Sequence, residues 1–385
     1  MHVPTIQYTD RPGLIDLGWG HPAPAALPVD LWRDCHAEAL RTFSWQALTY
    51  GYAAGPAPLV EWWCERLGHT DGRAPTPPEV FVTAGASQAL DLVAALLARP
   101  GDTVLVGSPT YHLALRILAD HGLDLVDAPG DDAGTDPVAT RELLHRLADE
   151  GRRVPLLYLV PTFANPTGTS LPADRRRALV EVAHGCGVTI VEDDTYRELG
   201  YDGLAPPSLW SLGPDAVVRV GSFAKTVGPG LRLGWLTARP ELVRALLARG
   251  FVHSGGGLNH TTALAMAVMG TSGRYAAHVD RIRAVYRRQR DSLVTALRQA
   301  AAVDCAVPHG GWFLWPRLPA GLSATGLLAR AEAHGVSFLP GRLFYARPPA
   351  DDRVRLSFSM YEPEPLAEAA RRLARALAGS VGASR

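Results

Sequence analysis

Hydrophobic and polar positions alternate along the first two thirds of the chain in a way that predicts short buried strands separated by helices. The strand candidates are apolar or β-branched runs bounded by Gly, Pro or Asp, at residues 80–83, 103–107, 156–160, 189–192 and 217–220. Apolar residues at helical spacing between these runs predict helices such as 87–98 and 172–184. Strands that alternate with helices are typical of βαβ units, so we expect an α/β fold with a mainly parallel sheet covered on both faces.

The pattern changes to one long helix around Val279, where Val279, Ile282 and Tyr286 recur at helical spacing and arginines fill the other face. We expect this helix to lead into a smaller α+β unit with strands near 311–316 and 354–358. The predicted organisation is an N-terminal segment that belongs with the small domain, a large domain and a small C-terminal domain, at residues 1–40, 41–278 and 279–385.

Composition narrows the class of partner. A chain of 385 residues suits two α/β domains. Its 38 basic and 38 acidic side chains balance, which argues against nucleic acid or an anionic membrane surface and favours a small molecule. The chain has neither a leader-like start nor a long apolar run, so we expect a cytoplasmic protein. The four cysteines have no CxxC spacing, and we expect reduced thiols without a metal site.

Lys225 is the only lysine in the chain, so the other 37 of the 38 basic side chains are arginine. A coding bias towards arginine explains why lysine is missing elsewhere. Arginine can replace lysine wherever only positive charge is needed, but it cannot act as an amine nucleophile or form an imine. The one remaining lysine therefore indicates a position that needs amine chemistry.

Ligands of an open parallel sheet bind beyond the carboxyl ends of its strands, where this sequence places several polar residues. Ala86 and Ser87 open the helix after the first predicted strand, and free N–H groups there can hold a phosphate, although such turns are common. Asn165 follows the third strand in an Asn-Pro-Thr-Gly turn, which ordinary turn chemistry also explains.

The last two strand ends offer carboxylates, a hydroxyl and cations. Asp193 and Asp194 follow the fourth strand, where either carboxylate could instead cap a helix. Ser222, Lys225 and Arg232 follow the fifth strand, and a hydroxyl with a guanidinium suits a phosphate. Together the residues at the strand ends could bind a phosphate, a pyridine nitrogen and a phenolic oxygen, and could form an imine.

These motifs resemble, in order and spacing, those of the class I and II aminotransferases of pyridoxal 5'-phosphate (PLP) fold type I. Residues 222–225, Ser-Phe-Ala-Lys, with Gly-Leu-Arg-Leu-Gly-Trp behind them, are similar to the lysine motif of the aminoadipate-type amino-acid aminotransferases. The resemblance covers nearly the whole chain. It implies a large domain, with a mainly parallel sheet sandwiched by helices, and a smaller α+β domain.

The resemblance also implies roles at the cofactor ring. Lys225 would hold PLP as a Schiff base and, once displaced, move the proton at the substrate Cα. Asp193 would pair with the ring nitrogen, because the family motif places this carboxylate three residues before Tyr196. Asn165 and Tyr196 would bind the phenolic oxygen, and Tyr111 would stack on the ring unless it is a plain packing residue.

Further positions match the family's phosphate and substrate contacts. The phosphate would be bound by Ala86, Ser87, Ser222, Arg232 and, from the partner subunit of a homodimer with shared active sites, Tyr50. Arg355 would bind the substrate α-carboxylate, although Arg353 lies on the same strand face and only the motif separates the two. Gly20 would belong to an N-terminal segment that closes over the substrate.

Two features depart from the family pattern. The turn at residues 85–87 has fewer hydroxyls than many relatives carry. Residues 253–260 are rich in glycine and histidine, and Trp312 and Trp315 flank Phe313 in the second domain. These features are either a flexible turn with core aromatic residues or parts of the substrate pocket.

The expected activity is transfer of an α-amino group from an L-amino acid to a 2-oxo acid. An oxidase, decarboxylase or lyase of specialised biosynthesis is an alternative, because small changes in substrate placement decide which Cα bond reacts. A ligand-sensing regulator is a second alternative, since such domains also occur fused to DNA-binding domains. The resemblance begins near Gly20, which leaves no room for a helix-turn-helix module, and the balanced charge gives no basic patch.

Overall fold

A seven-stranded sheet forms the centre of the large domain. The structure is a computed structural model that describes residues 10–300, 303, 305–347 and 351–381. The strand order is β2 (Val80–Thr83), β10 (Gly234–Thr237), β9 (Val217–Ser222), β8 (Thr189–Asp193), β7 (Leu156–Leu159), β3 (Thr103–Val106) and β4 (Asp124–Asp127). Neighbouring strands are parallel except β10, which is antiparallel to both β2 and β9. The predicted α/β fold with a mainly parallel sheet is confirmed.

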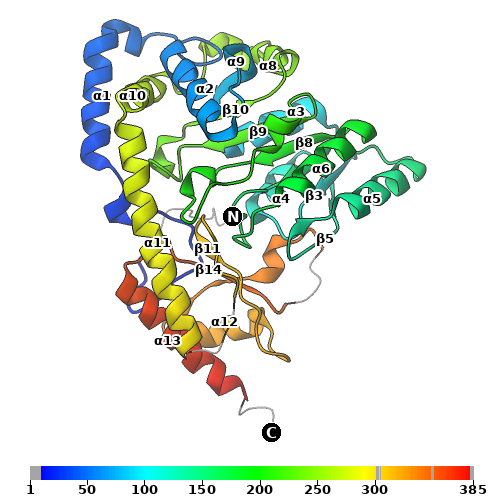
Figure 1. Ribbon diagram of the computed structural model, residues 1–385, viewed down its shortest axis with the longest axis vertical. Coiled ribbons are helices and arrows are strands. Elements are labelled where there is room, and N and C mark those ends of the chain that lie inside the picture. The colour runs from blue at the N-terminus through cyan, green and yellow to red at the C-terminus, as the bar shows by residue number, and fades with distance from the viewer. Residues whose placement is uncertain (1–9, 301–302, 304, 348–350, 382–385) are drawn as a thin grey trace.

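Helices cover both faces of this sheet (Figure 1). The helices and the short hairpin of the large domain are α1 (Val29–Phe43), α2 (Ala57–Asp71), α3 (Ala86–Leu97), α4 (His112–Asp120), β5 (Gly130–Asp131), β6 (Gly134–Thr135), α5 (Pro137–Asp149), α6 (Ala173–Cys186), α7 (Leu209–Leu212), α8 (Pro240–Leu247), α9 (Gly250–Gly255) and α10 (His260–Thr271). Because the sheet lies between these helices, only the ends of its strands are open to a ligand.

Side chains of the central strands point alternately to the two faces of the sheet, as strand geometry requires. In β7, Leu156 and Tyr158 join the core that includes residues of α3 and α4. Leu157 and Leu159 belong to the opposite core, with residues of α5 and α6. Both faces are therefore buried, which explains why this strand reads as an unbroken apolar run in the sequence.

Helix α11 (Arg274–Ala300) connects the large domain to the small domain along one side of the molecule (Figure 1). Its Val279 packs in a core with residues of α1, α2 and α10, whereas Ile282 and Tyr286 belong to the core of the small domain. The small domain consists of β11 (Phe313–Leu314), α12 (Ala324–Ala333), β12 (Val336–Ser337), β13 (Leu339–Pro340), β14 (Val354–Ser357) and α13 (Pro363–Val381), and β1 (Ile15–Asp16) pairs with β12.

The N-terminal segment divides between the two domains. Leu17, Ala23 and Ala26 pack in the core of the small domain. Cys35 and Ala39 of α1 pack in the large domain, where α1 contacts α10. The domain limits 1–40, 41–278 and 279–385 stay a prediction, but the apolar face of α1 belongs with the large domain, because α10 covers it.

Most of the secondary structure agrees with the sequence pattern, and two strands of the seven-stranded sheet, β4 and β10, were missed. The five predicted strands of the large domain correspond to β2, β3, β7, β8 and β9, and the helices predicted at 87–98 and 172–184 correspond to α3 and α6. Strand β4 is only partly buried and has an aspartate at each end, so its apolar signal is short. Strand β10 follows the lysine motif directly and consists of four residues.

The cysteines and the helices bear on the predictions made from composition. The four cysteines are free thiols. None of the helices that the structure describes is long and apolar enough to cross a membrane.

Candidate active site

Lys225 lies three residues after the end of β9, against two aromatic rings. Its Nζ is 4.8 Å from the centroid of the Trp312 ring and 5.5 Å from that of Tyr196. Burial disfavours the charged amine and Arg355 repels it, which together lower the pKa of Lys225 to about 8. A substantial fraction of the amine is therefore neutral near that pH, as a nucleophile or a base requires.

The two consecutive aspartates at the end of β8 have different partners. Asp193 accepts a hydrogen bond of 2.7 Å from the Tyr158 hydroxyl, and its charge acts on Lys225. Asp194 accepts hydrogen bonds of 2.9 and 2.6 Å from Arg219 in a buried ion pair. The strand geometry explains the difference, because successive side chains point to opposite sides. Only Asp193 lies among the other predicted site residues.

Arg355, on β14, is buried between the Phe313 and Phe344 rings, at 4.2 and 5.0 Å from their centroids. Its guanidinium donates hydrogen bonds of 2.8 Å to Asn165 Oδ1 and 2.5 Å to the Gly18 carbonyl. Within the described part of the chain its Nε has no hydrogen-bond partner. Burial lowers the pKa of Arg355 to about 10, so it stays charged at neutral pH with donors left for a ligand.

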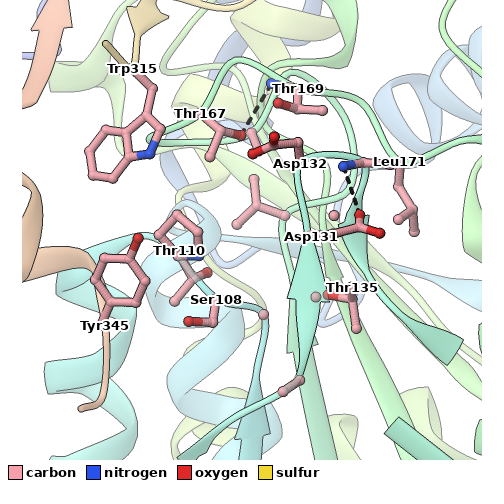
Figure 2. A pocket seen from close by; sticks show the side chains of 18 of the residues that line it. Ser108, Thr110, Asp131, Asp132, Thr135, Thr167, Thr169, Leu171, Trp315 and Tyr345 are labelled. Atoms are coloured by element: carbon pink, nitrogen blue, oxygen red, sulfur yellow. Dashed lines mark hydrogen bonds between the residues drawn. The ribbon is translucent and has the colours of Figure 1, made fainter. Parts of the chain in front are cut away.

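Arg353 has a different environment from Arg355, although the two are separated by one residue. Arg353 lines a cavity of about 810 Å³ between the two domains and makes a weak contact of 3.4 Å with the Trp315 carbonyl. Figure 2 shows that Trp315 and Tyr345 of the small domain face Ser108 and Thr110 of the large domain across this cavity. The buried position among Lys225, Asn165 and Tyr196 belongs to Arg355 alone of the two arginines.

The first turn of α3 lies against the Arg232 side chain, whose charge acts on Lys225. Gly85 precedes α3 with a φ of 98° and no side-chain cap, which leaves N–H groups of Ala86 and Ser87 free for a ligand. A Cβ at Gly85 would lie 2.9 Å from Nη2 of Arg232, so the guanidinium borders this turn. Arg232 has a φ of 48°, an uncommon conformation for a residue with a side chain, and Ser222 ends β9 nearby.

Asn259, in the glycine- and histidine-rich segment, holds the backbone of the Arg232 loop. Its side-chain amide donates hydrogen bonds to the carbonyls of Leu231, at 2.8 Å, and of Arg232. Gly257 has a φ of 98°, and a Cβ there would lie 2.1 Å from the Tyr52 carbonyl oxygen. Residues 256–259, between α9 and α10, thus form a close-packed turn that joins residues 50–52 to the Arg232 loop.

Tyr50 is not brought to the site of its own chain. It is 80% exposed, and Trp45, Leu48 and Tyr52 of the same segment are each more than 70% exposed. Large apolar side chains gathered on one exposed segment are typical of a protein contact surface.

Tyr111 and Gly20 border the site from other elements. Tyr111 immediately precedes α4, and burial together with the Asp193 charge raises the pKa of Tyr111 to about 12. The Gly20 backbone packs against the Phe313 ring, beside which Arg355 also lies. Stacking of Tyr111 on a cofactor ring stays a prediction.

The residues brought together fit PLP. A weakly basic amine, a buried carboxylate and free N–H groups beside a guanidinium suit the aldehyde, the ring nitrogen and the phosphate. The orphaned Nε of Arg355 fits a carboxylate beside them. Sequence reasoning missed Tyr158 and Asn259, because a tyrosine in an apolar strand and an asparagine in a turn carry no functional signal. Trp312 was noted as an aromatic residue, without its place beside Lys225.

Comparison with known proteins gives one family. A profile of the family described as aminotransferase class I and II matches residues 27–373. The 2-aminoadipate transaminase of Thermus thermophilus is 35% identical over 382 residues, which cover 97% of this chain and 92% of that protein. The aromatic-amino-acid aminotransferase 1 of Thermococcus litoralis is 33% identical over 379 residues, covering 96% and 89%.

A solved structure agrees over almost the same length. The kynurenine aminotransferase of Pyrococcus horikoshii, crystallised in complex with PMP, superposes with a TM-score of 0.90 at 31% identity. The match covers 96% of this chain and 92% of that one. The likeness therefore includes both domains and the long helix between them.

Proposed function

Because this chain belongs to the class I and II aminotransferases, we propose that Lys225, Asp193 and Arg355 form the centre at which it moves an amino group from an L-amino acid to a 2-oxo acid. Its cofactor is PLP. The observation that carries the proposal is the convergence of a weakly basic lysine, a buried carboxylate and a buried guanidinium from three separate elements.

Each residue has a distinct task in this proposal. PLP, when bound, withdraws electrons from the substrate Cα through its ring. Lys225 would hold the cofactor covalently and, when released, would accept the proton from the substrate Cα and deliver it to C4' of the cofactor. Asp193 keeps a negative charge beside the ring nitrogen. Arg355 binds the α-carboxylate and so orients the Cα–H bond towards the amine.

Asn165 and Tyr196 supply the donors at the phenolic oxygen. The Oδ1 of Asn165 already accepts a hydrogen bond from Arg355, which leaves its amide N–H groups to donate to the cofactor. Burial raises the pKa of Tyr196 well above its usual value, so its hydroxyl keeps the proton that it donates. The phosphate is bound by Ala86, Ser87, Ser222 and Arg232.

We infer that the preferred amino donor has an aromatic or other large apolar side chain. The walls around Lys225 and Arg355 are aromatic rings, those of Trp312, Phe313 and Phe344. Arg355 is taken by the α-carboxylate and Arg232 by the phosphate. The aromatic rings nearest Lys225 and Arg355 offer no charge to a second carboxylate, and the arginines Arg317, Arg347 and Arg353 line the cavity between the domains instead. The names of two similar proteins, an aromatic-amino-acid and a kynurenine aminotransferase, agree with this preference, whereas that of the 2-aminoadipate transaminase indicates a dicarboxylic donor.

A screen of donors against pyruvate, 2-oxoglutarate and oxygen tests both the reaction and the preference. We expect L-phenylalanine or L-tyrosine to give a kcat/KM at least about tenfold above that of L-glutamate or L-2-aminoadipate, because a second buried carboxylate would lack a partner. One 2-oxo acid should be consumed for each amino acid. Oxygen uptake or CO₂ release in place of this exchange would contradict amino-group transfer, and better turnover of dicarboxylic donors would contradict the preference.

We further propose that the protein works as a homodimer, with Tyr50 of the partner subunit at the phosphate. The exposed apolar side chains of Trp45, Leu48 and Tyr52 next to Tyr50 provide a surface for such a contact. A site that needs two chains is incomplete in each chain alone.

Complementation between two damaged chains tests this arrangement. One chain has Lys225→Arg and the other has Tyr50→Ala, and both are expected to be poorly active alone. Hybrids formed by co-expression should recover activity, because Lys225 of one chain and Tyr50 of the other make one intact site. Sedimentation checks the dimer mass. Absence of recovery in hybrids of confirmed composition would place Tyr50 outside the partner's site.

A further inference from the structure

Tyr158 is a fully buried tyrosine on β7, in a strand of otherwise apolar residues. Its relative exposure is 0%, and its ring packs with residues of α3, α4 and the neighbouring strands. The adjacent strand β8 ends at Asp193, and the Tyr158 hydroxyl is 2.7 Å from Oδ2 of that carboxylate. One strand therefore delivers a hydroxyl directly to the carboxylate of the next strand.

The other contacts of Asp193 are weak. Its Oδ1 accepts a long hydrogen bond of 3.3 Å from the Thr195 backbone N–H, and the Thr195 side chain lowers the pKa of Asp193 less than Tyr158 does. In the part of the chain that the structure describes, no guanidinium or amine forms an ion pair with Asp193, in contrast to Asp194, which Arg219 holds. Tyr158 is thus the principal hydrogen-bond donor to the Asp193 side chain within this chain.

The chemical consequence concerns the charge of the carboxylate. Burial raises the pKa of Asp193, which favours the neutral acid, whereas the hydrogen bond from Tyr158 acts in the opposite direction. A protonated Asp193 has no negative charge. It could therefore not act as the counterion of a protonated ring nitrogen of the cofactor. A hydroxyl that donates to the carboxylate stabilises the ionised form.

We propose that Tyr158 is a positioning residue, whose hydroxyl fixes Asp193 and keeps it ionised so that its other oxygen binds the protonated ring nitrogen of PLP. The inference rests on the proposed function, in which Asp193 faces that nitrogen. It adds a residue two strands away from the lysine, in the hydrophobic layer beneath the site. Packing alone explains a ring at this position but not a hydroxyl pointed at a carboxylate, since phenylalanine would fill the same space.

The test compares Tyr158→Phe with Tyr201→Phe, each purified as the PLP-loaded enzyme. Both replacements remove one buried phenol hydroxyl, and the Tyr201 hydroxyl donates to the Gly311 carbonyl, so the second variant measures the structural cost of such a loss. Two readouts apply: the affinity for PLP of protein stripped of cofactor, and the ¹⁵N NMR shift of the ring nitrogen in protein loaded with ¹⁵N-labelled PLP.

In Tyr158→Phe we expect PLP to bind roughly tenfold to a hundredfold more weakly, as for loss of a hydrogen bond to a charged group. The ¹⁵N shift should move towards the value of the unprotonated ring. In Tyr201→Phe both readouts should match the parent, while its thermal stability falls about as far as that of Tyr158→Phe. Unchanged affinity and an unchanged ¹⁵N shift in Tyr158→Phe would overturn the inference.

A third variant, Asp193→Asn, separates this inference from the proposed function. If Asp193→Asn retains PLP and a protonated ring nitrogen, the role proposed for Asp193 is wrong, and the inference about Tyr158 fails with it. If Asp193→Asn loses both but Tyr158→Phe loses neither, the proposed function stands and only the role of Tyr158 is wrong.

Discussion

Replacing Lys225 with arginine should reduce turnover by roughly a thousandfold or more while the protein still folds. Arginine keeps the positive charge and the approximate length, and it serves at every other basic position of this chain. A guanidinium stays protonated at any usable pH, so it can neither bind the cofactor covalently nor accept the Cα proton. The measurements are the steady-state rate, the visible absorption of the lysine-bound cofactor and the thermal unfolding temperature.

The pH dependence of cofactor rebinding gives a second measure of the same residue. In the parent stripped of PLP, the rate of covalent rebinding should rise as the pH increases through about 8, because the pKa of Lys225 is lowered to that value and only the neutral amine reacts. The Lys225→Arg variant should show no such phase.

The double variant Lys225→Arg/Arg288→Lys is the matched control. Arg288 is exposed on α11, so this chain again has one lysine but at the surface. It should be as inactive as the single variant. A substantial rate in either variant would defeat the role given to Lys225.

Replacing Arg355 with glutamine should raise KM for the amino donor about tenfold to a hundredfold, and PLP should stay bound. A hydrogen-bonded contact between charged groups contributes about 1.5 to 3 kcal/mol, and the substrate carboxylate would lose its partner in a buried site. Initial rates over a range of donor concentrations, with absorption spectra of the bound cofactor, measure the two effects.

Arg353→Gln is the control for this prediction, since Arg353 lines the cavity between the domains and not the buried cluster. Its KM should stay within about twofold of the parent, as expected for a partly exposed side chain. Arg355→Lys is a second variant, for use if Arg355→Gln fails to fold. It keeps a buried cation but removes the guanidinium that binds the carboxylate. If Arg353→Gln raises KM and neither Arg355 variant does, Arg353 and not Arg355 binds the substrate carboxylate.

The large domain could be predicted from sequence because its strands are buried on both faces, so that each is an uninterrupted apolar run such as Leu156–Leu159. Lys225 could be found from composition alone, since a charge is replaceable by arginine and an amine is not. The order of the strand ends then brought Asn165, Asp193 and Ser222 into one region.

The roles of other site residues depend on contacts between distant parts of the chain, which sequence periodicity does not reveal. Arg353 and Arg355 share a strand face by period, so that periodicity alone does not separate them; the family motif does, and the packing of Arg355 between Phe313 and Phe344 agrees with it. Tyr158 reads as one more core residue, because its hydroxyl partner lies 35 positions further along the chain. The role of Asn259 requires the fold that brings its turn to the Arg232 loop.

That turn has a consequence for how the molecule behaves as an assembly. Gly257 packs directly on the backbone of the exposed segment 50–52, and Asn259, two residues later, holds the carbonyls of Leu231 and Arg232. A shift of the turn would therefore act together on the proposed subunit contact surface and on the Arg232 loop, which is proposed to bind the phosphate. Such coupling is reciprocal: if cofactor binding tightens association of the subunits, association must tighten cofactor binding by the same factor. In the proposed homodimer, cofactor loss and subunit dissociation would then be coupled equilibria, each favouring the other.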